Sequence, residues 1–196
     1  PLPTFVGALT RRANAPTVLV CAHLAGPQLF GAEISLLDVL DGLNQLGMNV
    51  LVSLPGVQHL GYFAEIRLRA TAIAVLPYGW WKQGMAPCTA TVMNFQRLIR
   101  AHEVSLVYLN TLVLDEPLLA ARSLQLPVAV HVREVPESDP ALCGVLGASA
   151  EQIRQRLLTH ADGLIANSRR VLRYLQGEDT ARLPIHVVPN IVHCSR

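Results

Sequence analysis

One pattern constrains the fold of this chain more than any other: short runs of apolar residues without polar interruption. The first run, Thr17–Ala22, reads Thr-Val-Leu-Val-Cys-Ala. Continuous runs rich in β-branched residues are typical of strands that are buried on both faces of a sheet. The same pattern recurs at Asn49–Leu54, Ala72–Leu76, Val104–Leu109, Pro127–Val132, Gly163–Ala166 and Ile185–Val188.

Segments with helical spacing separate these runs. In the first segment, Leu36, Leu37, Leu40 and Leu43 form one apolar stripe, and Gly47 is placed to end the helix. The other segments are Asn94–His102, Glu116–Ser123, Glu151–His160 and Ser168–Leu175. Strands that alternate with amphipathic helices indicate a parallel sheet. We therefore predict an α/β, Rossmann-like fold with a doubly wound, mostly parallel sheet of about seven strands.

Length and composition fit one such domain. The chain has 196 residues, of which 51% are hydrophobic and 15% are charged, and this length can bury a substantial core. Residues 1–16 show no periodicity, so we expect a leader there. We expect the domain to span residues 17–190 and an interdomain linker to begin at residues 191–196.

Several functional classes do not fit the composition. The net charge is only +2 and no basic stripe is interleaved with aromatic residues, which argues against nucleic acid as a partner. Cys21, Cys88, Cys143 and Cys194 form no CxxC pair, so we predict neither a zinc site nor disulfides, but reduced thiols in a cytoplasmic protein. No apolar run reaches the roughly 20 residues of a membrane span. Lys82 is the only lysine, and the bias toward arginine suggests a bacterial source.

Ligands of doubly wound sheets bind at the carboxyl ends of the strands, near the point where strand order reverses. The loop after the first strand contains Gly31 and Ala32 at the start of a helix, where backbone N–H groups can approach an anion. The loop is neither GxGxxG nor a P-loop, which weakens dinucleotide and ATP binding as interpretations. Glu33 either binds substrate or offsets the helix dipole.

The fourth and fifth strands end in polar residues. Asn110 and Thr111 either bind substrate or cap the next helix. His131, Arg133 and Glu134 gather a donor, a fixed cation and an acceptor at one strand end. Arginine suits phosphate or carboxylate recognition, and His131 is our catalytic candidate because it can donate to a hydroxyl or to developing charge. The alternative is a core histidine beside a local ion pair.

Two further loops carry candidates. Trp80 and Trp81 follow the third strand, where one ring can stack on a sugar or touch a membrane surface, while the alternative is that one ring caps the core. Ser168 is a natural helix N-cap. Arg169 and Arg170 oppose the dipole of the same helix, a cost that a bound anion would relieve, although solvated surface arginines are the alternative.

The order of these motifs resembles the N-terminal half of the family-4 retaining glycosyltransferases, which have the GT-B fold. The matching segments are Gly31–Glu33, Ser35–Leu37, Leu46–Val52, Leu106–Thr111, Leu126–Glu134, Ala161–Ser168 and His186–Asn190. Two positions depart from the family pattern. Phe30 replaces the first glycine of a Gly-Gly pair, and either His131 or Arg133 takes the place of the family histidine, with Glu134 as the acidic residue after it.

The resemblance implies a hexosyl-transferring enzyme of polysaccharide or lipopolysaccharide biosynthesis. This half would bind a glycan or lipid-linked acceptor, at the inner face of the membrane if the acceptor is a lipid. The nucleotide-sugar donor would be a co-substrate bound mainly by the enzyme's own C-terminal domain, with no cofactor and no metal. Gly31 and Ala32 would approach the donor phosphates. The acceptor side would comprise Glu33, Trp80, Trp81, Asn110, Thr111, Arg133 and Glu134. This chain alone would be inactive.

A second hypothesis is a non-catalytic, single-domain Rossmann-like module that binds a ligand or a partner. A third, a nicotinamide-dependent oxidoreductase or epimerase, lacks the GxGxxG motif. It also lacks an acidic residue at the end of the second strand, where Leu54, Pro55 and Gly56 stand instead.

Overall fold

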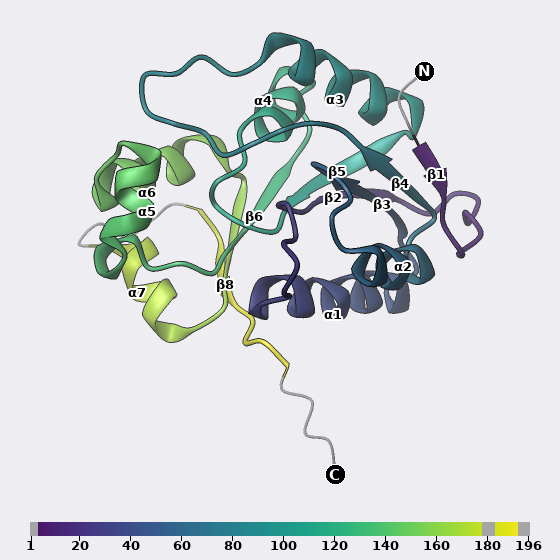
Figure 1. The fold of residues 1–196 in the computed structure, drawn as a ribbon, viewed down its shortest axis with the longest axis horizontal. Coiled ribbons are helices and arrows are strands. Elements are labelled where there is room, and N and C mark those ends of the chain that lie inside the picture. The colour runs from purple at the N-terminus through teal and green to yellow at the C-terminus, as the bar shows by residue number, and fades with distance from the viewer. Residues whose placement is uncertain (1–3, 178–182, 192–196) are drawn as a thin grey trace.

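A computed structural model of the chain describes residues 4–177 and 183–191, which form one α/β sheet structure (Figure 1). The strands are β1 (Thr4–Val6), β2 (Thr17–Cys21), β3 (Asn49–Leu54), β4 (Ala72–Val75), β5 (Val104–Leu109), β6 (Val128–Val132), β7 (Gly163–Ala166) and β8 (Ile185–Val187). The helices are α1 (Gly31–Gln45), α2 (Leu60–Arg69), α3 (Thr89–Ala101), α4 (Glu116–Ser123), the short 3-10 helix η1 (Pro136–Ser138), α5 (Pro140–Leu146), α6 (Ala150–His160) and α7 (Arg169–Gln176).

The strand order reverses in the middle of the sheet. The order is β1-β4-β3-β2-β5-β6-β7-β8, and every pair is parallel except β1 with β4. The chain starts the parallel sheet at β2, builds outward through β3 and β4, and then returns to add β5 on the other side of β2. The predicted doubly wound sheet is therefore confirmed, and its switch point lies between β2 and β5.

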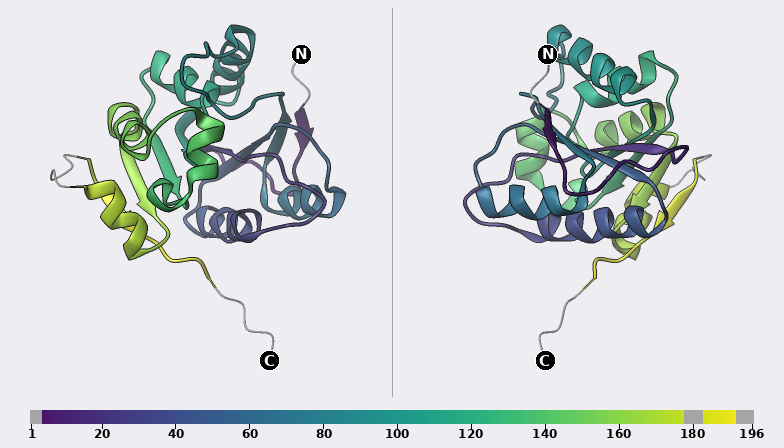
Figure 2. Two further views of the ribbon diagram at one scale, coloured as in Figure 1. Left: turned by 60° about the vertical axis from the view of Figure 1, so that its left-hand side comes forward. Right: turned by 90° about the vertical axis from the view of Figure 1, so that its right-hand side faces the viewer.

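Helices cover both faces of the sheet and create two cores. On one face, α1 and α2 bury Leu36, Leu40 and Ile66 against the strands. On the other face, α3, α4, α5, α6 and α7 bury a larger set that includes Phe95 and Leu157. Figures 1 and 2 show α1 and α2 together on one side of the sheet and α3 and α4 on the other. Burial on both faces explains why the inner strands β2 and β3 read as unbroken apolar runs.

The structure adds elements that the sequence analysis did not predict. β1 lies in the segment expected to be a leader and pairs with the edge of β4. Gly7, just after β1, packs so closely that an added Cβ would meet the carbonyl oxygen of Ala70 at 1.9 Å. α2 was missed because two of its leucines, Leu60 and Leu68, face solvent and obscure the helical stripe. α5 and η1 are too short to show a period, and α3 begins five residues before the predicted Asn94.

The end of α1 follows the prediction. Gly47 has a φ of 80°, which is the left-handed conformation that glycine adopts without strain. The N–H of Met48 donates to the carbonyl of Leu43 at 3.1 Å, so the chain closes the helix and turns directly into β3. Among the described residues, Cys21, Cys88 and Cys143 are free thiols; Cys194 and most of the expected linker, residues 192–196, lie outside the described part.

Candidate functional site

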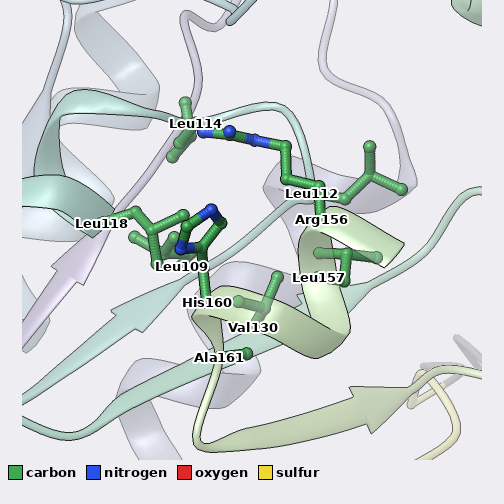
Figure 3. Close-up of a pocket in the computed structure, with 9 residues that line it drawn as sticks. All are labelled: Leu109, Leu112, Leu114, Leu118, Val130, Arg156, Leu157, His160 and Ala161. Atoms are coloured by element: carbon green, nitrogen blue, oxygen red, sulfur yellow. The ribbon is translucent and has the colours of Figure 1, made fainter. Parts of the chain in front are cut away.

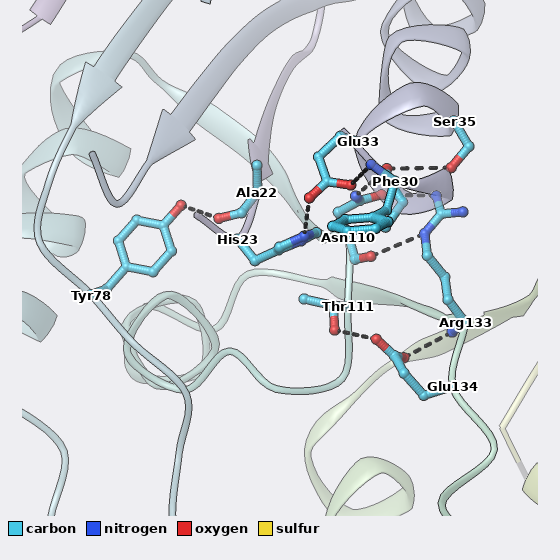
Figure 4. Close-up of polar contacts among 11 residues, drawn as sticks. Ala22, His23, Phe30, Glu33, Ser35, Tyr78, Asn110, Thr111, Arg133 and Glu134 are labelled. Carbon is cyan, nitrogen blue, oxygen red and sulfur yellow. Dashed lines mark hydrogen bonds and ion pairs between the residues drawn. The ribbon is translucent and has the colours of Figure 1, made fainter. Parts of the chain in front are cut away.

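Side chains from three adjacent strand ends meet at the switch point. His23 follows β2, Asn110 follows β5, and Arg133 follows β6 (Figure 4). The start of α1 lies beside them, because the loop after β2 leads into that helix. This is the place where open α/β sheets bind ligands.

His23 and Glu33 form a pair behind the start of α1. The Nε2 atom of His23 lies 2.8 Å from Oε1 of Glu33, and the Glu33 side chain is only 4% exposed. The second carboxylate oxygen accepts the backbone N–H of Phe30 at 3.0 Å. Phe30 is the N-cap of α1 but its side chain cannot accept a hydrogen bond, so Glu33 alone fixes this helix end. Sequence reasoning missed His23, although a histidine two residues beyond a buried strand was a usable signal.

Asn110 connects α1 to Arg133 and is completely buried. Its Nδ2 donates to the carbonyl of Ala32 at 3.2 Å. Its own carbonyl and its Oδ1 accept from Nε and Nη2 of Arg133, at 3.2 and 2.9 Å. Asp115 is the N-cap of α4, so Asn110 and Thr111 do not cap that helix. The structure leaves them a positioning role at the sheet edge.

Thr111 and Glu134 form the lower part of the cluster in Figure 4. The Thr111 hydroxyl donates to Oε1 of Glu134 at 2.8 Å, and Oε2 accepts the backbone N–H of Arg133 at 3.0 Å. The carboxylate of Glu134 therefore binds the backbone of Arg133 and not its guanidinium, so the local ion pair considered in the alternative interpretation does not form. Asn167, after β7, adds a bond from Nδ2 to the carbonyl of Arg133 at 3.3 Å.

His131 has a different place from the one expected of a catalytic residue. It lies within β6, is 2% exposed, and its Nδ1 contacts Nη2 of Arg133 at 3.1 Å and the hydroxyl of Tyr108 at 2.5 Å. Because a guanidinium only donates, Nδ1 is an acceptor and the ring proton resides on Nε2. Burial, with a smaller contribution from Arg133, lowers the pKa of His131 to about 3. His131 is thus a neutral support behind Arg133, and Arg133 occupies the outer position.

The two tryptophans separate into one buried and one exposed ring. Trp81 is 6% exposed, donates from Nε1 to the carbonyl of Leu112 at 3.1 Å, and lies 4.9 Å beneath the guanidinium of Arg156. Trp80 is 47% exposed and its backbone forms an isolated bridge with Leu114. Trp81 therefore plugs the core, as the alternative interpretation held for one ring, and its indole is not available to a ligand.

A cavity near Trp81 has no room for a substrate (Figure 3). Its volume is about 10 Å³, which is the size of one water molecule. Arg156 at its rim forms an ion pair with Asp115, whose pKa is raised by burial. The lining residues are Leu109, Leu112, Leu114, Leu118, Val130, Arg156, Leu157, His160 and Ala161.

The start of α7 is the remaining candidate region. Ser168 caps this helix as predicted, since its hydroxyl accepts the N–H of Val171 at 3.3 Å. Arg170 donates to the hydroxyl of Ser138, and both Arg169 and Arg170 are exposed. An anion at this helix stays a prediction. Within residues 4–177 and 183–191, no group of three or more His, Cys, Asp or Glu side chains is placed to hold a metal ion. Nor is any helix in that part of the chain both long and apolar enough to cross a bilayer.

Comparison with known proteins gives a family match. A model of the glycosyl transferase 4-like domain matches residues 30–191. No curated protein matches the chain.

Solved structures share the fold. Alr3699/HepE from Anabaena, crystallised with UDP and glucose, superimposes with a TM-score of 0.60 and 19% identity over 88% of this chain and 44% of that one. MnaA from S. aureus, crystallised with UDP, gives a TM-score of 0.62 and 12% identity over 89% and 44%. A glycosyltransferase from Rickettsia africae gives 0.53 and 15% over 90% and 43%. The chain spans less than half the length of these three proteins.

Proposed function

The chain belongs to the glycosyl transferase 4-like domain family, and from this premise we propose that it is the acceptor-side half of a glycosyltransferase. The enzyme transfers a hexosyl group from a nucleotide-sugar donor to a glycan or lipid-linked acceptor. The observation that carries the proposal is the polar cluster at the switch point between β2 and β5, because it lies where this fold binds ligands.

The cluster has a supporting layer and a facing layer, and this division assigns the roles. Glu33, Asn110, Thr111 and His131 are buried, so they act as positioning residues. Arg133 and Glu134 are half-buried and face the acceptor. Phe30, which is 65% exposed at the start of α1, lies beside them as an apolar surface. Groups held this way by buried partners can meet a substrate without reorganising.

Gly31 and Ala32 supply the approach to the donor phosphates. Apart from its chain neighbours and the adjacent backbone of α1, no heavy atom of the described residues lies within 4 Å of the place where a Cβ of Gly31 would stand, so a ligand can come close to this backbone. The first turn of α1 also presents its N–H groups and the positive end of the helix dipole. Among the two tryptophans, the exposed Trp80 extends the acceptor surface. Ser168, Arg169 and Arg170 form a weaker, second anion contact.

The complete enzyme needs a second domain in this account. Two of the structurally similar proteins are about twice as long as the chain. We propose that the sheet domain, with β1 at its edge, is the acceptor domain, that a linker begins at residue 191, and that a second domain binds most of the donor. The chain alone is then inactive. The reaction takes place in the bacterial cytoplasm, without a metal or cofactor, and at the membrane face if the acceptor is a lipid.

The test is sugar transfer by the full-length natural protein. A panel of nucleotide sugars is offered with lipid extracts and oligosaccharides, and acceptor-dependent nucleotide release is measured. Glu33→Ala should abolish release, while Glu103→Ala should not, because Glu103 lies at the amino end of β5, opposite the strand ends that form the site. Ligand binding without transfer from any donor would instead support the non-catalytic binding module.

A further inference from the structure

Arg133 is a half-buried cation whose side chain contacts only neutral groups. Its guanidinium donates to the carbonyl and Oδ1 of Asn110, to Nδ1 of His131, and from Nη1 to Oδ1 of Asn190 at 2.9 Å. No carboxylate of the described residues forms an ion pair with it. Burying a charge without an opposite partner is costly, so this arrangement calls for an explanation.

The two nearby carboxylates have partners of their own. Glu33 accepts from His23 and from the N–H of Phe30, and Glu134 accepts from Thr111 and from the N–H of Arg133. Every carboxylate oxygen of these two residues is therefore hydrogen-bonded to a group other than the guanidinium. Their charges reach Arg133 at longer range, but burial outweighs them and lowers the pKa of Arg133.

Other shielded arginines in the molecule differ in this respect. Arg69, whose side chain is 25% exposed, bonds the carboxylates of Asp41 and Glu65, and these bonds raise its pKa. Arg154 pairs with Glu151, and Arg156 pairs with Asp115. These three arginines thus each pair with a carboxylate, whereas Arg133 at the switch point does not.

One edge of the guanidinium faces an exposed side chain. Arginine has five N–H donors, and the contacts to Asn110 and His131 use the single N–H of Nε and both of Nη2. Tyr108 is a further hydrogen-bonding neighbour of the guanidinium, and on Nη1 one N–H bonds the exposed Asn190. The Nη1 edge is therefore the part of Arg133 that a ligand can reach, by displacing a single surface amide.

We propose that Arg133 binds an oxyanion of the acceptor, either a phosphate or a carboxylate, and that the amide oxygen of Asn190 occupies its place in the unliganded site. The assignment of the anion to the acceptor rests on the proposed function. It makes the acceptor an anionic molecule, either a phosphate-linked lipid or an acidic sugar. Asn110 and His131 hold the guanidinium in the orientation that presents Nη1.

Calorimetric titration of the full-length natural protein tests this assignment. The probes are methyl phosphate and glucuronate, with methyl glucoside as the uncharged counterpart. At least one anion should bind the wild type and Arg69→Gln equally, and Arg133→Gln at least tenfold more weakly. Selectivity for methyl phosphate would identify a phosphate-linked acceptor, and selectivity for glucuronate an acidic sugar. Equal binding by wild type and Arg133→Gln, or no anion binding at all, would overturn the proposal.

A second variant gives a change of opposite sign. Asn190→Ala removes the competing amide at an exposed position, so the preferred anion should bind about fivefold more tightly, the equivalent of one modest hydrogen bond. Unchanged or weaker binding would contradict the displacement of Asn190. Loss of the Arg133-dependent binding when UDP is added would assign the anion to the donor and overturn the acceptor assignment.

The binding measurements distinguish failure of this anion site from failure of the proposed enzyme. Arg133-dependent anion binding in a protein that transfers no sugar would retain this site and refute the enzyme. Sugar transfer with an unchanged acceptor KM in Arg133→Gln would retain the enzyme and refute this site.

Discussion

Two regions of the molecule each contain a pair of like residues, two tryptophans in one and two histidines in the other. In each pair one side chain is more deeply buried than its counterpart. The loop after β4 has Trp81 in the core and Trp80 at the surface, with exposed fractions of 6% and 47%. The switch point has His131 within β6 beside a cation and His23 after β2 beside a carboxylate. Residue type suggested both regions as sites, but only at the switch point do the residues form a hydrogen-bonded network that presents a charged group.

Replacing each tryptophan separately by alanine should give the largest difference in stability. Trp81→Ala removes a buried ring and its hydrogen bond to Leu112, so it should lower the free energy of unfolding by about 3–5 kcal/mol. Trp80→Ala should cost less than about 1 kcal/mol because the ring is half exposed. Urea denaturation of both variants measures the difference. Equal losses would mean that the two rings are not divided by burial.

The next effect concerns pH. The pKa of His131 falls from 6.5 to about 3 on folding, so the unfolded chain binds the extra proton. The stabilisation is therefore complete above about pH 6.5 and is lost as the pH falls toward 3. At about 1.4 kcal/mol per pH unit, this group should remove about 3 kcal/mol between pH 6.5 and pH 4. Urea titrations across this range measure the slope.

His131→Asn provides the control for that slope. Its amide can accept the bond from Arg133 near the position of Nδ1 but does not titrate, so its stability should depend less on pH. A slope identical to that of the wild type would show that other groups cause the loss.

His23 should affect turnover more than stability. His23→Ala frees the Glu33 carboxylate and disturbs the start of α1, and a displacement of this kind can lower kcat about 100-fold. His23→Gln should restore much of the loss because its amide can still donate to Glu33. His102→Ala is the control, since His102 follows α3 and lies near the amino end of β5, opposite the strand ends that form the site. Failure of Gln to restore activity would point to chemistry by the imidazole itself.

The smallest expected change in activity tests whether Gly31 lies at the donor site. Gly31→Ala and Gly42→Ala both introduce a methyl group on α1 where the protein has open space, so both should leave stability unchanged or raise it by up to about 1 kcal/mol. Only Gly31→Ala should lower kcat/KM for the donor, by about tenfold, because its methyl group meets the phosphates. Equal kinetics of the two variants would remove Gly31 from the donor site.

The sequence predicted the inner strands of the sheet well because burial on both faces leaves a direct mark. All seven parallel strands appear as apolar runs, and the bounds of β3, β5 and β7 agree with the prediction. β1 left no such mark, since it is a three-residue edge strand whose residues are exposed. α2 was hidden for a related reason, because exposed leucines broke its stripe.

The sequence predicted the region in which the candidate site lies, but not which of its side chains are in contact. Strand ends identified Glu33, Asn110 and Arg133, but the pairing of His23 with Glu33 depends on the path of an irregular loop. The sequence also left open whether His131 or Arg133 stands for the family histidine. The predicted strand already ended at Val132, but the sequence could not show that His131 is buried against Tyr108 and bonds Arg133 from behind.

We expect the acceptor to bind mainly at the switch point, on Arg133 and Glu134, with Trp80 only extending that surface. A crystal structure of the full-length natural protein with its acceptor and the nucleotide product tests it most directly. We predict that the acceptor lies within hydrogen-bonding distance of Arg133 and Glu134, with the nucleotide phosphates against the backbone of Gly31. An acceptor bound against Trp80 and away from Arg133 would contradict the account.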